Sequence, residues 1–129
     1  MKRVITSIAI HCSATRPSQD IGAADITAWH KKQGWRTIGY HWVIRRDGTL
    51  EKGRDEAIAG AHVEGHNANS VGVCLVGGVA QDDFTKPENN FTPRQFATLK
   101  RLLTDLARRF PDAVVKGHRD YPKVKKACP

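Results

Sequence analysis

The sequence predicts an α/β fold for the chain of 129 residues, with a central mixed β-sheet of about five to six strands flanked by helices. Short apolar or β-branched segments at 4–11, 71–76 and 113–116 have the composition of strands. Two segments with apolar residues at helical spacing, 23–33 and 92–110, lie between them. The order along the chain is strand, helix, hairpin, strand, helix, strand, and the length is that of one domain.

The first strand and the first helix are predicted from different periodicities. Residues 4–11 alternate and contain β-branched side chains, which favours a strand that ends at His11. The helix over 23–33 is predicted because Ile26 and Trp29 lie three positions apart and so share a face.

A hairpin follows, and then a buried strand. Residues 41–46 and 49–51 flank Asp47-Gly48, a dipeptide typical of tight hairpin turns. Residues 71–76 form the continuous apolar run VGVCLV, which predicts a central strand covered on both faces.

The longest predicted helix begins at residues 92–95, where TPRQ forms a capping box with proline at the first helical position. Its apolar stripe consists of Phe96, Leu99, Leu102, Leu103, Leu106 and Phe110. Pro111 ends the helix, and a short strand over 113–116 then leads to Gly117 and His118.

Composition excludes several classes of protein. With 40% hydrophobic and 26% charged residues, the chain is not collagen, a coiled coil or a disordered protein. Its 21 Lys and Arg against 13 Asp and Glu leave a net charge of +8. Such an excess suits a polyanionic partner, an anionic surface or simple solubility, and charge alone does not choose among them.

The sequence predicts neither a membrane protein nor an exported one. No apolar stretch approaches the roughly 18 residues that spanning a bilayer requires. Two basic residues precede the apolar run near the N-terminus, but Thr6 and Ser7 interrupt that run, so we predict a first strand and no signal peptide. We therefore expect a cytoplasmic protein.

The cysteines predict reduced thiols. Cys12, Cys74 and Cys128 are odd in number and widely spaced, unlike the cysteines of a disulfide scaffold. Cys12 points away from His11 if the strand continues, and we expect it to be a small buried residue. Cys74 lies within the most apolar strand and is predicted to belong to the core.

Three residues with zinc-binding side chains lie at strand ends or just beyond them: His11, His118 and Cys128. Two imidazoles and a thiolate suit zinc, and three protein ligands leave the open position of a catalytic site. Neighbouring strands would bring the two histidines together. The spacing alone leaves open the ordinary alternative that these histidines are solvated or hydrogen-bonded.

Other polar residues give weaker signals. Next to Trp29, His30 is expected to be structural, and Asp120 is either a zinc ligand or the partner of Arg119. A glycosidase would need two carboxylates facing each other across a cleft. The candidates for such a pair, none in a distinguishing context, are Glu51, Asp55, Glu56 and Glu64.

At residues 11–56, HCSATRPSQDIGAADITAWHKKQGWRTIGYHWVIRRDGTLEKGRDE, the chain closely resembles the zinc-dependent amidases of tailed coliphages. These proteins are N-acetylmuramoyl-L-alanine amidases and share their fold with peptidoglycan recognition proteins. The resemblance covers almost the whole chain. It continues through GAH at 60–62, NSVGVCLVGG at 69–78, FTPRQ at 91–95, GHRD at 117–120 and KACP at 126–129.

The resemblance implies a zinc centre and two catalytic residues. The zinc ligands of the family fall on His11, His118 and Cys128, and its catalytic tyrosine and lysine fall on Tyr40 and Lys126. The implied reaction is hydrolysis of the amide between the lactyl group of N-acetylmuramic acid and L-alanine of the stem peptide. Zinc would supply hydroxide and polarise the carbonyl, and the lysine would offset the oxyanion.

The resemblance also implies residues that bind substrate. It places His62 in the groove for the peptide stem, and Asn67 and Asn69 at the rim of that groove. His41 points the other way along the strand from Tyr40 and is expected to be structural.

Together these expectations describe residues 1–129 as a single catalytic amidase domain, most simply a monomeric phage or prophage endolysin that needs a separate pore-former to reach the wall. Two alternatives stay open. The first is a non-catalytic peptidoglycan-binding module of the same fold, although the match retains both catalytic residues and all three ligands. The second is a regulator that binds nucleic acid or a phage RNA polymerase, as some phage relatives do; no nucleic-acid motif supports it.

Overall fold

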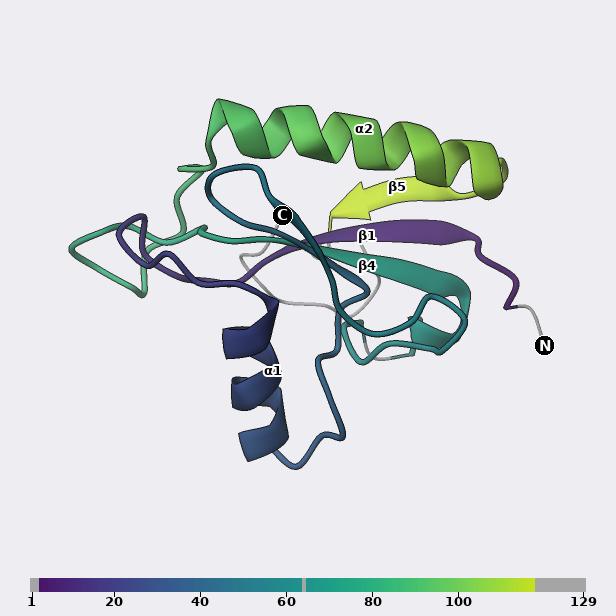
Figure 1. Cartoon of the computed structure of the whole chain (residues 1–129), viewed down its shortest axis with the longest axis horizontal. Helices are drawn as coiled ribbons and strands as arrows, with labels where there is room; N and C mark the ends of the chain where they lie inside the picture. Colours follow the sequence, from purple (N-terminus) through teal and green to yellow (C-terminus); the bar gives the residue numbers. More distant parts are fainter. Residues whose placement is uncertain (1–2, 64, 118–129) are drawn as a thin grey trace.

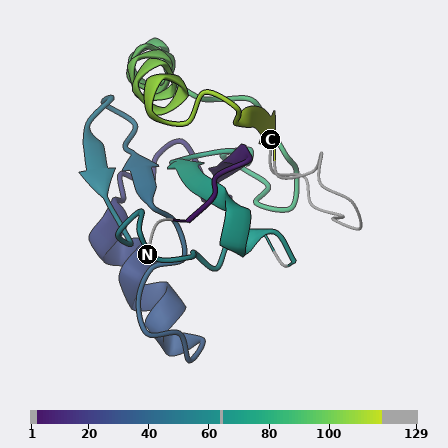
Figure 2. The same ribbon diagram turned by 90° about the vertical axis from the view of Figure 1, so that its right-hand side faces the viewer.

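The structure is a computed structural model that describes residues 3–63 and 65–117. Its elements in chain order are β1 (Ser7–Cys12), α1 (Ala23–Lys32), β2 (Trp42–Ile44), β3 (Leu50–Lys52), a 3₁₀ turn (Asn67–Asn69), β4 (Ser70–Leu75), α2 (Pro93–Arg109) and β5 (Val114–Gly117). The two helices lie on opposite sides of the sheet (Figures 1 and 2). This arrangement confirms the predicted α/β fold of a mixed sheet flanked by helices.

Five strands pair in the order β3-β2-β4-β1-β5. Strands β2, β4, β1 and β5 run parallel to one another. Strand β3 is antiparallel to β2, and the two form the predicted hairpin. In the register, His11 pairs with Cys74 and Ile10 pairs with Gly117. The carboxyl ends of β1 and β5 therefore meet at one edge of the sheet, and this edge positions the candidate site.

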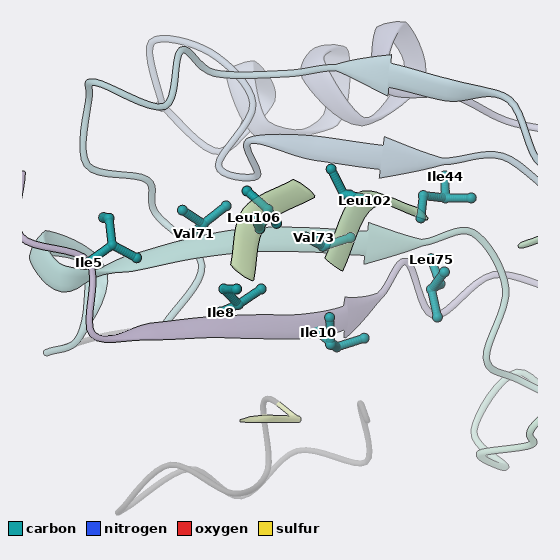
Figure 3. Packing of buried hydrophobic residues seen from close by; sticks show 9 residues of the cluster. All are labelled: Ile5, Ile8, Ile10, Ile44, Val71, Val73, Leu75, Leu102 and Leu106. Atoms are coloured by element: carbon teal, nitrogen blue, oxygen red, sulfur yellow. The ribbon is translucent and has the colours of Figure 1, made fainter. Parts of the chain in front are cut away.

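One face of the sheet forms the larger core. Ile8 and Ile10 of β1 pack with Leu102 and Leu106 of α2 and with neighbouring valines of β4 (Figure 3). Because side chains alternate along a strand, His11 projects from the opposite face. The amphipathic stripe predicted for residues 92–110 thus covers the side of the sheet that lacks the candidate site.

The capping box predicted at the start of α2 is present. Thr92 Oγ1 accepts a hydrogen bond from Gln95 N at 3.1 Å, and Gln95 Oε1 accepts one from Thr92 N at 2.9 Å. The amide group of Gln95 also donates to Ile44 O at 3.2 Å and to Val76 O at 2.9 Å. One buried side chain therefore both begins the helix and fastens it to the sheet.

The smaller core lies on the other face, between the sheet and α1. Ile26 packs there with Val43, Cys74 and Val76, whereas Trp29 remains 40% exposed. The helical face predicted from sequence is therefore buried only in part, because α1 packs through its first turns and then extends away from the sheet (Figure 1).

Strand boundaries differ from the predictions by a few residues. The first strand begins at Ser7 and includes Cys12, while Val4 is 70% exposed before it. Cys12 and Cys74 are buried free thiols, as predicted. In the part of the chain that the structure describes, no helix combines the length and apolar character needed to cross a bilayer.

Candidate active site

His11 is the penultimate residue of β1, on the face of the sheet opposite α2, and is only 1% exposed. Its ring lies 5.1 Å from that of Tyr40 and 4.9 Å from that of His62, measured between ring centroids. The Nε2 atom of His11 lies 2.9 Å from Nδ1 of His62, which is a hydrogen bond between the two imidazoles. A predicted zinc ligand, a predicted catalytic residue and a predicted groove residue are thus brought together.

Tyr40 lies in the segment that enters β2 and is half-buried. Its side chain packs against the smaller core, which contains the fully buried thiol of Cys74. Burial raises the pKa of this thiol well above its ordinary value, so Cys74 remains a neutral group at physiological pH. The tyrosine ring therefore rests between the buried core and the His11 imidazole.

The loop that carries His62 is organised by one side chain. Asn67 Oδ1 accepts hydrogen bonds from the backbone nitrogens of His62 at 2.8 Å and Val63 at 2.9 Å. The His62 ring itself is buried, and its Nε2 lies 3.2 Å from the hydroxyl of Ser70. That His62 and Asn67 contact substrate stays a prediction. What the structure shows is that both residues make hydrogen bonds within the protein.

Glycine makes room for the His62 ring against the sheet. A Cβ atom on Gly72 would lie 2.7 Å from two carbon atoms of that ring. Real Cβ atoms do not approach so closely, so only glycine allows the imidazole to pack on β4. This close approach holds His62 beside His11, whose partner in the sheet register is Cys74.

Two other histidines have structural roles, as predicted. His41 is fully buried, accepts from Gly72 N at 3.0 Å and contacts Ile58 O at 2.8 Å. Burial is the main cause that lowers the pKa of His41, and it keeps the ring neutral. His30 accepts from Gly39 N at 2.9 Å.

The carboxylates considered for a glycosidase are engaged elsewhere within the described residues. Glu51 accepts a hydrogen bond from Ala23 N at the start of α1. Glu56 forms an ion pair with Arg109 and accepts from Trp42 Nε1. Asp55 caps Ala57 N at 2.8 Å, and Glu64 lies outside the described residues. The described carboxylates therefore stabilise loops and a helix end, and they do not form a pair of opposed catalytic acids.

The remaining predicted site residues, His118, Lys126 and Cys128, lie outside the described residues, as does Asp120. In the segments 3–63 and 65–117, no group of three His, Cys, Asp or Glu residues could hold a metal ion. The chemistry of His11 nevertheless fits zinc. Its imidazole is buried, and a hydrogen bond at Nε2 orients the ring, as is usual for histidines that bind a metal through the other nitrogen.

Sequence reasoning missed two residues beside the site. Ser70 begins β4 and is fully buried against His62. Arg3 donates to Glu56 O, to Asn67 O and to Ser70 O, and so ties the N-terminal segment to the loop before β4. Neither residue belongs to a periodic pattern, and only the tertiary contacts reveal them.

Comparison with known proteins places the chain in a family. The family model described as N-acetylmuramoyl-L-alanine amidase matches residues 1–129. The chain belongs to this family. The amidase is therefore an enzyme that cleaves the bond between N-acetylmuramic acid and L-alanine in peptidoglycan.

Individual relatives agree with this assignment. The amidase is 51% identical to the endolysin of Klebsiella phage KP32 over 129 residues, which are 99% of this chain and 83% of that protein. It is 50% identical to the endolysin of Escherichia phage T7 over 123 residues, 95% of this chain and 79% of that protein. The solved endolysin amidase LysCS from Clostridium intestinale superposes with a TM-score of 0.81 at 30% identity, covering 97% and 74% of the two chains.

Proposed function

We propose that the amidase is a zinc hydrolase in which His11, His118 and Cys128 hold the metal, and Tyr40 and Lys126 assist the reaction. The observation that carries the proposal is the position of His11. It is buried at the end of β1, its ring centroid lies 5.1 Å from that of Tyr40, and the neighbouring strand β5 leads directly to residue 118. Two imidazoles and a thiolate form a donor set that suits a catalytic zinc site with one open position.

The bound metal would polarise the scissile carbonyl and lower the pKa of a water molecule. Tyr40 would hydrogen-bond that water and hold or relay its proton. The ammonium group of Lys126 would offset the negative charge that develops on the carbonyl oxygen. His11 would keep its place through the hydrogen bond from its ring to His62.

The proposed biological role is that of a phage or prophage endolysin. Its support is the similarity to two phage endolysins over nearly the whole chain. In this role the enzyme would accumulate in the host cytoplasm and reach the wall through a separate pore-former. It would act as a monomer on the glycan–peptide junction of the wall, with His62 and Asn67 near the peptide stem. Binding to a phage RNA polymerase stays a prediction from the resemblance.

A lysis assay on purified cell wall, combined with metal analysis, tests the zinc proposal. We expect one zinc per chain, loss of lysis in a strong chelator and recovery when zinc is returned. His11→Ala, His118→Ala and Cys128→Ala should each lose both zinc and activity, whereas the control His66→Ala should keep both. Full lysis without bound zinc would refute the metal mechanism.

The third ligand can be tested separately. If Cys128→Ala kept full zinc stoichiometry while Asp120→Ala lost it, then the carboxylate and not the thiolate would complete the site. Loss of zinc in Cys128→Ala alone is the expected result, because thiolate is the softer donor and binds zinc strongly.

A further inference from the structure

A row of hydrogen bonds starts at His11 and ends on the backbone. His11 Nε2 lies 2.9 Å from His62 Nδ1, and His62 Nε2 lies 3.2 Å from Ser70 Oγ. The Ser70 hydroxyl in turn donates to the carbonyl oxygen of His66 at 2.8 Å. Both ring nitrogens of His62 are therefore used inside the protein.

The last bond sets the direction of the others. A serine hydroxyl carries one proton, and that of Ser70 is given to the His66 carbonyl. Ser70 Oγ must then accept a hydrogen bond from Nε2–H of His62. In the neutral ring of His62, Nδ1 is consequently the acceptor, and it receives the proton of His11 Nε2. The neutral His11 ring is left with its lone pair on Nδ1.

The packing around His62 leaves its ring little freedom. The side chain is 8% exposed and lies against Gly72, where any Cβ atom would clash with it. Asn67 Oδ1 holds the backbone at this point, because it accepts hydrogen bonds from His62 N and Val63 N. Rotation of the ring would break the bonds to His11 and Ser70 together, so the direction of the row is fixed by the fold.

We propose that His62 and Ser70 are positioning residues that hold His11 in the tautomer whose Nδ1 binds zinc. This inference rests on the proposed function, which makes His11 a ligand. An outer hydrogen-bond partner orients a ligating imidazole and increases its basicity, and loss of such a partner typically weakens metal affinity by about 10- to 100-fold. On this assignment His62 orients a zinc ligand in addition to lying near the peptide stem.

Zinc affinity measured by competition with a chromophoric chelator tests the proposal. We expect Ser70→Ala and His62→Ala to weaken zinc binding by about 10- to 100-fold. His62→Asn should restore most of the affinity, because its amide oxygen can replace Nδ1 as the acceptor. The matched control is His66→Ala, which keeps the backbone carbonyl that accepts from Ser70 and should bind zinc normally.

The tautomers can be observed directly in the unmodified protein. Long-range ¹H–¹⁵N correlation spectra distinguish Nε2–H from Nδ1–H imidazoles, and the His11 signals are identified by their absence from a His11→Asn variant. We expect the Nε2–H form for both His11 and His62. An Nδ1–H form of His11 would overturn the proposal, whether or not His62→Ala folds.

The outcomes separate this inference from the zinc proposal. Full zinc binding by His11→Ala would refute the role of His11 as a ligand, and the inference with it. Loss of zinc in His11→Ala together with unchanged affinity in folded Ser70→Ala and His62→Ala would refute the positioning role alone. A raised KM with unchanged zinc affinity in His62→Ala would instead make His62 a substrate contact.

Discussion

His11 and His41 are both almost fully buried, yet their hydrogen bonds give the two imidazoles different chemistry. His41 uses both ring nitrogens on the backbone of Gly72 and Ile58. His11 shares a hydrogen bond through Nε2 with the side chain of His62, and the proposed function assigns its other nitrogen to zinc. For a single histidine, the residue type sets the possible roles, and the neighbouring groups decide which role it takes.

Tyr40→Phe should separate metal binding from catalysis. The phenyl ring can keep its packing beside His11, whereas the hydroxyl that would orient the attacking water is lost. We expect zinc stoichiometry to be unchanged and kcat to fall by about 10²- to 10³-fold. Metal analysis and wall hydrolysis on the same preparation check this, and an unchanged kcat would remove Tyr40 from the mechanism.

Gly72→Ala should disturb the site through packing. The new Cβ would meet the His62 ring at 2.7 Å, so the ring must move away from β4. Such overpacking typically costs about 1–3 kcal/mol of stability. Chemical denaturation should show this loss, and zinc affinity should fall with it. Wild-type stability and affinity would mean that the His62 loop is free to shift.

Among the secondary-structure elements, α2 shows how a local signal and a tertiary contact coincide. The TPRQ motif predicts the start of the helix, and the same glutamine reaches two carbonyls, those of Ile44 and Val76. The cap and the attachment to the sheet therefore depend on one side chain.

Gln95→Ala should destabilise the amidase by about 1–3 kcal/mol, because it removes one half of the capping box and two buried hydrogen bonds. Urea denaturation measures the change. Lys100→Ala, an exposed position on the same helix, is the control and should stay within about 0.5 kcal/mol of wild type. Equal effects of the two substitutions would show that Gln95 does not fasten the helix.

For the whole molecule, stability should depend on the protonation of His41. Burial is the main cause of its lowered pKa, and the Arg3 and Arg54 guanidinium groups act in the same direction, whereas the Ile58 carbonyl and Glu56 oppose it. The unfolded chain therefore binds this proton more readily than the native state. The contribution of His41 is complete above the ordinary pKa of about 6.5 and is lost as the pH falls through the lower native value.

This dependence can be measured from thermal unfolding between pH 7.5 and 5 in wild type and in His41→Asn. The asparagine oxygen can still accept from Gly72 N but does not titrate. We expect the Tm of the variant to fall less than that of wild type as the pH decreases. Zinc release at low pH affects both proteins, so it cancels in the difference between the two curves. Parallel curves would show that another group controls the acid response.

Sequence patterns alone predict most of this fold. The alternation before His11, the VGVCLV run and the helical stripe over 92–110 each appear as the expected element, with ends shifted by a few residues. Such patterns are visible because burial of one face repeats with the period of the element. Trp29 departs from its pattern, since a helix that packs only through its first turns leaves later apolar positions exposed.

The sequence by itself determined the order of elements, the amidase motifs and the candidates His11 and Tyr40, because these features are local in the chain. The tertiary structure decided what surrounds them. His62 lies 51 residues from His11, and the two meet only because a glycine in β4 lets the ring pack on the sheet. A hydrogen bond between residues so far apart depends on strand register and loop geometry, which no short motif encodes. The assignment of Ser70 and His62 therefore required the folded arrangement.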